Sequence, residues 1–170
     1  MREAIGGTWL LQIVIFFILF FTGYICLSIN QSKAYNVKDS IVKAIERENG
    51  INTNSQLSNG IGDDALESIV DYLKSVSYRT SGKCPDPIKV NNDTISYVGY
   101  NRDGRIDNNN ASFCIAKVDT SNYAPGSYNE LPSMAYYKVA VFYQLDIPIF
   151  SSLLGFYHTA DTKIISTEKK

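Results

Sequence analysis

Apolar residues are concentrated in one uninterrupted run near the N-terminus. Residues 4–32, a stretch of 29 positions, contain no charged side chain, and residues 9–29 supply 21 predominantly apolar positions within it. The hydrocarbon core of a bilayer is about 30 Å thick, and a helix needs roughly 20 apolar residues to cross it. The pattern therefore predicts a single transmembrane helix over residues 8–29.

The length of this run favours a permanent anchor over a cleaved secretory signal. The apolar core of a secretory signal is about 7 to 15 residues long and ends at a small-x-small cleavage site. Here the run is longer and ends in Tyr24, Ile25, Cys26 and Leu27. Cys26 does not fit a lipoprotein cysteine, because the bulky Ile25 precedes it where that processing requires a small residue.

Helical periodicity continues beyond the predicted span. Apolar residues recur at steps of three and four at Ala34, Val37, Ile41 and Ile45, and charged residues occupy the other faces. Asn49 and Gly50 then provide a helix stop. We expect a helical stalk over residues 30–49, so that residues 8–48 form one helix about 60 Å long.

A second, shorter helix is expected after a polar loop. Residues 52–62 are rich in Asn, Ser and Gly and predict the loop. Asp63 and Asp64 suit the positive N-terminal end of a helix. The apolar stripe of this helix would consist of Leu66, Ile69, Val70, Leu73 and Val76.

The remainder of the chain alternates with a period of two, which is typical of half-buried strands. Strands are predicted over residues 95–100, 112–118 and 136–145, with a fourth candidate over residues 159–167. One face of the third strand would carry Tyr137, Val139, Val141, Tyr143 and Leu145. The apolar residues 147–156 are interrupted by Pro148 and Gly155, so we expect a loop or short turn that contacts the membrane or a partner.

These elements define an α+β fold class. A long N-terminal transmembrane and stalk helix would lead into a small α+β domain over residues 50–170. That domain would be a small antiparallel β-sheet packed against the second helix. About 120 residues suffice for one hydrophobic core.

The cysteines suggest the side of the membrane on which this domain lies. With Cys26 set aside in the span, two cysteines remain, Cys84 and Cys114. Their pairing as a disulfide would require an oxidising compartment. We therefore expect an extracytoplasmic domain on a single-pass protein of the cell membrane. Charge counting favours the opposite orientation, because four basic residues follow the span: Lys33, Lys38, Lys43 and Arg47.

Charge and motif content exclude several classes of function. The chain has 16 basic and 17 acidic residues and a net charge of -1, so no overall basic field indicates a nucleic-acid partner. It contains no Gly-rich phosphate loop, no nucleophile elbow and no metal-ligand spacing of His and Cys. The single histidine, His158, is expected to pack or cap. The sequence predicts no enzyme, no cofactor and no metal site of this kind.

One loop partly matches a calcium-binding pattern. Residues 101–107 place Asn101, Asp103 and Asp107 at the third, fifth and ninth positions of such a loop, with Gly104 at its sharp turn. The first ligand position would be Gly99 and the twelfth Asn110, and neither residue suits its position. The favoured alternative is a hairpin turn at Asp103 and Gly104 that joins the first two predicted strands.

The two ends of the chain resemble a known family. Residues 7–17, GTWLLQIVIFF, are similar to the start of type IV prepilin-like proteins, in which a peptidase cuts after a glycine and a glutamate stands fifth after the cut. Residues 138–143, 147–150 and 164–168 resemble the ending of TadE-like pseudopilins of the tight-adherence pilus. The resemblance implies a leader over residues 1–7, cut between Gly7 and Thr8. Gln12 then occupies the fifth position as a helix-assembly contact.

The resemblance implies a mechanical function. The chain would be a TadE-like minor pilin or pseudopilin that contributes to assembly of a type IV-like pilus or related secretion filament. Its partners would be other pilin-like subunits, the pilus assembly platform, a prepilin peptidase and the lipid bilayer. Two alternatives stay open: Gly6 and Gly7 only loosen the start of a membrane helix, or the protein is a membrane-anchored binding module unrelated to pili, with a ligand surface built from its 12 tyrosines.

Overall fold

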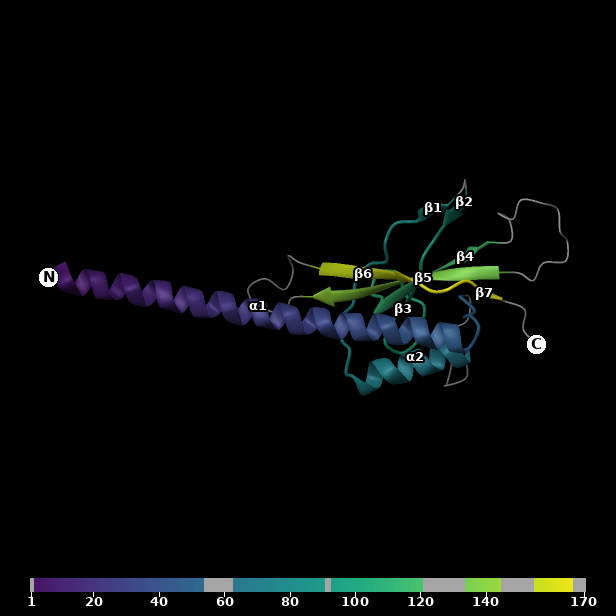
Figure 1. Cartoon of the computed structure of the whole chain (residues 1–170), viewed down its shortest axis with the longest axis horizontal. Helices are drawn as coiled ribbons and strands as arrows, with labels where there is room; N and C mark the ends of the chain where they lie inside the picture. The colour runs from purple at the N-terminus through teal and green to yellow at the C-terminus, as the bar shows by residue number, and fades with distance from the viewer. Residues whose placement is uncertain (1, 54–62, 91–92, 121–133, 145–154, 167–170) are drawn as a thin grey trace.

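A computed structural model describes residues 2–53, 63–90, 93–120, 134–144 and 155–166. Helix α1 (Arg2–Arg47) is a single long rod whose N-terminal part extends away from the rest of the molecule (Figure 1). Helix α2 (Asp64–Ser75) packs beside the C-terminal part of α1. The strands lie against the same part of α1, so that its first half is left uncovered (Figure 1).

Seven strands form two antiparallel sheets in the described part of the chain. The smaller sheet pairs β1 (Ile88–Val90) with β2 (Asp93–Ile95). The larger sheet has the order β3-β4-β5-β6, with β7 also paired to β5. Its members are β3 (Val98–Tyr100), β4 (Phe113–Asp119), β5 (Met134–Gln144), β6 (Gly155–Asp161) and β7 (Ile165–Ser166). This α+β arrangement, with its long N-terminal helix, confirms the expected pilin-like fold class.

The end of α1 is fixed by two residues with positive φ. Asn49 has φ 55° and Gly50 has φ 122°, and the Gly50 amide donates to the Ile45 carbonyl at 2.9 Å. A Cβ atom at position 50 would lie 2.8 Å from the Tyr137 hydroxyl oxygen. The backbone conformation therefore requires glycine, and a side chain here would also displace the Tyr137 hydroxyl. The predicted helix stop at Asn49 and Gly50 is confirmed.

Helix α2 begins at the acidic pair, as expected. The Asp63 side chain is the N-cap and accepts a hydrogen bond from the Ala65 amide at 3.1 Å. Four members of the predicted stripe are buried: Leu66, Ile69, Val70 and Leu73. Val76 departs from the prediction, because it is the C-cap residue and is 37% exposed.

The C-terminal half of α1 is part of the hydrophobic core. Ala34, Val37, Ile41 and Ile45 are at most 1% exposed. They share a core cluster with the α2 stripe and with one face of β5, formed by Tyr137, Val139 and Val141. The period-two prediction for this face of β5 is confirmed as far as Tyr143, and Leu145 lies outside the described residues. The helix and the sheet therefore form one packed unit from about Ala34 onward.

Two predicted strands differ from those observed. The segment expected as one strand over residues 95–100 is divided at Ser96 and Tyr97, because β2 pairs with β1 and β3 pairs with β4. The candidate strand over residues 159–167 is also divided. Thr162 interrupts it, since its hydroxyl accepts the Tyr137 amide at 2.9 Å in place of a strand partner. β6 accordingly begins earlier, at Gly155. Most of the apolar run over residues 147–156 lies outside the described residues.

Candidate functional site

The uncovered part of α1 is the most unusual surface of the molecule. Every described residue from Thr8 to Thr22 is exposed, including Trp9 at 70% and Phe16 at 71%. Leaving a Leu or Phe side chain in water costs about 1.5 to 3 kcal/mol relative to burying it. This part of α1 is long and apolar enough to cross a membrane. The residues expected to span, 8–29, lie within it.

The polar residues of this helix segment differ in their hydrogen bonding. The Thr22 hydroxyl donates to the Ile18 carbonyl of the same helix at 2.8 Å, which satisfies it without any partner subunit. Gln12 is exposed on α1 among apolar neighbours. Its amide group both donates and accepts, so it is suited to a contact with a second helix in an apolar environment.

The candidate leader cleavage site lies inside the helix. Gly7 and Thr8 are both within α1, and Gln12 follows Thr8 by about one helical turn. These three residues thus occupy one short section at the free end of the rod (Figure 1). No other described helix or strand lies beside this section of α1 (Figure 1). Gln12 is therefore exposed with respect to the described part of the chain.

Cys84 and Cys114 are joined by a disulfide across the domain. Their Cα atoms are 5.8 Å apart, and 30 residues separate them in sequence. Cys114 is buried in β4, and Cys84 precedes β1. The bond therefore fastens the segment that carries the smaller sheet onto the larger sheet. Cys26 is free and exposed on α1.

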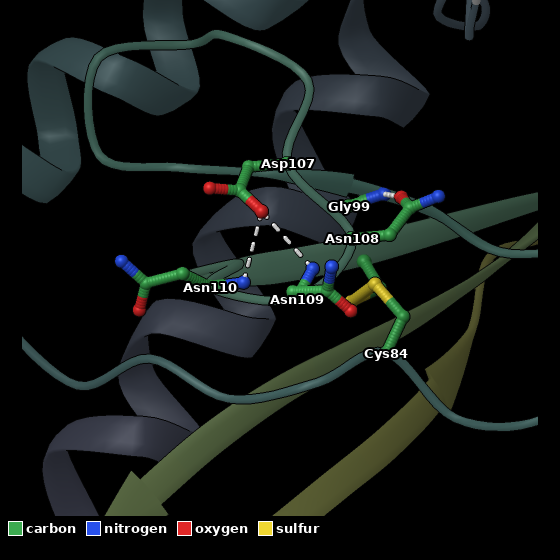
Figure 2. The surroundings of a disulfide bond; sticks show 7 residues. Cys84, Gly99, Asp107, Asn108, Asn109 and Asn110 are labelled. Carbon is green, nitrogen blue, oxygen red and sulfur yellow. Dashed lines mark hydrogen bonds between the residues drawn. A yellow bond between two sulfur atoms is a disulfide. The ribbon is translucent and has the colours of Figure 1, made fainter.

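Gly99 lies directly against this disulfide (Figure 2). A Cβ atom at position 99 would meet Cys84 Sγ at 2.6 Å and the Asp107 carbonyl oxygen at 2.7 Å. The Gly99 amide donates to Asn108 Oδ1 at 2.6 Å, and the Cys84 amide donates to the Asn108 carbonyl at 3.0 Å. Asn108 therefore links β3 to the segment that carries Cys84.

The loop with partial calcium-binding character uses its side chains on its own backbone. Asn101 Oδ1 accepts the amides of Asp103 and Arg105, each at 3.0 Å. Asp107 Oδ1 accepts the amides of Asn109 and Asn110, each at 3.0 Å (Figure 2). Within the described ranges, no three His, Cys, Asp or Glu side chains gather in a way that would hold a metal ion.

The turn in this loop is present, but its place in the sheet differs from the prediction. Gly104 has φ 76°, and its amide donates to the Asn101 carbonyl at 3.0 Å. The turn brings Tyr100 opposite Ile106 in an isolated bridge. Residues 107–112 then intervene before β4, so the turn does not join β3 directly to β4.

A stack of aromatic rings joins α1 to the sheet, and the sequence did not predict it. Tyr35 stacks on His158 with ring centroids 4.3 Å apart, and His158 stacks on Tyr143 at 4.6 Å. Tyr143 in turn stacks on Phe156 at 5.3 Å. Burial lowers the pKa of His158, and the charge of Lys38 lowers it further. Both effects favour the neutral imidazole. The ring contacts on both sides of His158 agree with the expectation that it packs.

Two buried tyrosines fix other segments to the core. The Tyr78 hydroxyl donates to the Phe142 carbonyl, and the Tyr100 hydroxyl donates to the Thr53 carbonyl at 3.0 Å. Burial raises the pKa of Tyr78 to about 12 and that of Tyr100 to about 12. Both phenols stay protonated at neutral pH and act as hydrogen-bond donors.

The face of the sheet turned away from α1 carries tyrosines around an ion pair. Lys138 Nζ lies 2.7 Å from Asp161 Oδ2 and 5.5 Å from the centre of the Tyr136 ring. Tyr97 is buried beside this pair, and burial is the main cause that raises its pKa. Tyr157 on the same face is 52% exposed. These tyrosines and the ion pair thus lie together on one face of the sheet.

Comparison of the chain with protein-family models, with curated proteins and with solved structures finds no match.

Proposed function

We propose that the chain is a TadE-like minor pilin or pseudopilin that contributes to assembly of a type IV-like pilus or related secretion filament. The observation that carries the proposal is the division of α1 into two parts within one unbroken helix. The first part is apolar and exposed, and the second part is a core element of the sheet domain.

This construction would transmit movement of the helix to the domain. Val37, Ile41 and Ile45 are at most 1% exposed within the core cluster, so the helix is packed into the domain. A tether needs only an apolar span and a linker. A subunit that is drawn out of the membrane into a filament needs its helix to stay fixed to its outer domain. The continuous α1 supports the second description.

The exposed side chains of α1 require a new apolar environment outside the membrane. Trp9, Phe16 and Phe20 are each at least 64% exposed. Extraction into water would expose all of them at about 1.5 to 3 kcal/mol each. Packing against the helices of other pilin-like subunits would prevent that loss. Thr22 and Gly23 are small enough to allow close contact between such helices.

Gln12 is proposed as the polar contact of this helix assembly. If a prepilin peptidase cuts between Gly7 and Thr8, Gln12 is the fifth residue of the mature chain. An amide cannot neutralise the amino terminus of a neighbouring subunit as a glutamate would, but it can accept a hydrogen bond from it. Such interhelical hydrogen bonds contribute about 1 to 2 kcal/mol each in model peptides in membranes.

The experiment is recovery of partners with the tagged full-length chain from its own cells. Gln12→Leu should insert normally, because leucine is more favourable than glutamine in hydrocarbon, but should lose other pilin-like subunits and the assembly platform. Thr22→Val is the matched control, since it keeps the size of the side chain and removes only a hydroxyl that bonds within its own helix. Partner recovery at the native level from the Gln12→Leu variant would refute the assembly role of Gln12.

Processing of the leader has its own test. Mass spectrometry of the mature protein should find Thr8 at its N-terminus if a prepilin peptidase acts on it. A mature chain that still begins at Met1 or Arg2 would show that the leader is retained. That result would favour the description of Gly6 and Gly7 as a loosened start of a membrane helix.

The second candidate function is an anchored binding module at the cell surface. The tyrosines around Lys138 and Asp161 favour it, because amphipathic rings beside an ion pair suit a polar ligand. The two functions differ in what they require of the span. Shuffling residues 9–20, Gln12 included, should leave a tethered binding module active, whereas a filament subunit should lose assembly.

A further inference from the structure

One end of the β5 and β6 pair points toward the apolar part of α1. His158 contacts Tyr35, whereas the Lys163 amide donates to Glu46 of α1 at 2.9 Å. The sheet therefore runs alongside α1, with the end near Gln144 and Gly155 closest to the exposed apolar half of the helix. Figure 1 shows the C-terminal end of β5 and the N-terminal end of β6 on the side of the sheet toward the N-terminal part of α1.

This end of the sheet carries aromatic side chains on both faces. Tyr143 and Phe156 stack on the face toward α1 with centroids 5.3 Å apart. Phe142 and Tyr157 form an edge contact on the opposite face at 6.4 Å. Phe156 is 39% exposed and Tyr157 is 52% exposed. We call Tyr35, Tyr143, Phe156 and Tyr157 the aromatic end.

The position of the aromatic end along α1 matches the membrane interface. Tyr35 follows Ile29, the last residue of the expected span, by six residues, or about 9 Å of helix. The headgroup region on each side of a bilayer is about 5 to 8 Å thick, since the full bilayer is about 40 to 45 Å and its core about 30 Å. Phe156 lies two strand positions, or about 7 Å, closer to the span than His158, which contacts Tyr35. Phe156 would thus lie within the headgroup region.

Basic groups accompany these rings. Lys38 Nζ lies 4.6 Å from the centre of the Tyr35 ring, and Lys33 is exposed on α1 closer to the span. Amphipathic rings and long basic side chains are the residues that occupy the boundary between lipid and water. Lipid phosphates would complement the charges of both lysines.

We propose that the aromatic end is a membrane-interface docking surface, so that the sheet domain rests on the phospholipid headgroups. The occupant is lipid, because the surface is continuous with the apolar helix and lies at the depth of the headgroups when α1 spans the bilayer. The proposal depends on the membrane location of α1 and is independent of the pilus role. In this arrangement the domain contacts the headgroups through Phe156, and no free length of stalk separates the domain from the bilayer.

The test uses the full-length chain in phosphatidylcholine vesicles with a minor fraction of phosphatidylglycerol and with no other protein. Trp9 is the single tryptophan of the chain, so Trp9→Phe provides a background without tryptophan. In that background, Tyr157→Trp should lose most of its fluorescence to a phospholipid quencher placed at headgroup level, and less to a quencher placed deep in the acyl chains. Phe156→Trp is a second reporter and should show the same order.

Tyr136→Trp is the matched control on the same face of the sheet. Tyr136 precedes Phe142, the strand partner of Tyr157, by six residues, which is about 20 Å of strand. It should show no quenching by either lipid quencher. Water-like, unquenched emission from both the Phe156→Trp and the Tyr157→Trp variants would overturn the proposal. A second outcome would also overturn it: emission that is blue-shifted, is not quenched by the lipid quenchers and depends on protein density. That outcome would show that a second copy of the chain covers the surface.

Discussion

Tyr35 of α1 and His158 of β6 lie face to face, with ring centroids 4.3 Å apart and planes inclined by 27°. This contact joins the long helix to the outer strand of the sheet, close to the point where α1 becomes exposed. His158 also stacks on Tyr143, and Lys38 is the charged group that acts on it. The pKa of the His158 imidazole therefore depends on the packing of α1 against the sheet.

Stability should fall as the pH is lowered past the ordinary range of histidine. Burial and Lys38 lower the pKa of His158, so below about pH 6.5 the unfolded chain binds a proton that the folded chain resists. The stability that neutral His158 contributes to the folded state is fully present above about pH 6.5. It is lost as the pH falls through the pKa of His158 in the folded state. His158→Phe keeps a ring between Tyr35 and Tyr143 but does not titrate. Thermal midpoints measured between about pH 8 and about pH 5 should fall less steeply for this variant, and equal slopes would contradict the assignment.

The disulfide should be a major support of the domain. Closing the 30-residue separation between Cys84 and Cys114 contributes about 3 to 4 kcal/mol in the chain-entropy model. The double variant Cys84→Ala and Cys114→Ala should lose an amount of this order in denaturant unfolding. Cys26→Ala is the control and should unfold like the native chain. Free thiols at both positions in protein taken from cells would show that the bridge does not form there.

Gly99 should not tolerate even a methyl group. Gly99→Ala would place a Cβ atom 2.6 Å from Cys84 Sγ and 2.8 Å from the Ala111 Cβ. Overpacking of this kind costs about 1 to 3 kcal/mol. The free energy of unfolding of Gly99→Ala should fall below that of the native chain by an amount of this order. A value equal to that of the native chain would mean that β3 moves away from the disulfide.

The sheet domain is predicted to face outward. The Cys84–Cys114 bond needs an oxidising compartment. Lys33, Lys38 and Lys43 follow the span, and by charge counting alone they would favour the cytoplasmic side. Protease added to intact cells with the wall removed should digest the domain, and detergent should not be required. Complete protection that detergent abolishes would place the domain on the cytoplasmic side.

The sequence predicted those features that local patterns determine. Steps of three and four at Ala34, Val37 and Ile41 marked the buried face of α1, because one face of a helix repeats at that spacing. The alternation of apolar and polar residues over residues 136–145 marked the core face of β5, because one face of a strand repeats at every second residue. Asp63 as a cap and Gly50 as a stop follow from backbone hydrogen bonding alone.

The features that the sequence did not predict depend on contacts between segments that are distant along the chain. Tyr35 and His158 meet only after β6 folds back beside α1, and neither residue has a local pattern that points to the other. Thr162 divides a predicted strand because its hydroxyl replaces a backbone partner of Tyr137. Gly99 is required by the disulfide beside it, which the residues around Gly99 do not indicate.

Photo-crosslinking from the exposed part of α1 tests the filament role most directly. Phe16 is 71% exposed, so a photoreactive phenylalanine derivative at this position replaces one aromatic ring by another. In its own cells, illumination should join this variant to other pilin-like subunits through their N-terminal helices, as identified by mass spectrometry. Adducts formed with lipid alone would contradict assembly through α1 and would leave the helix as a tether.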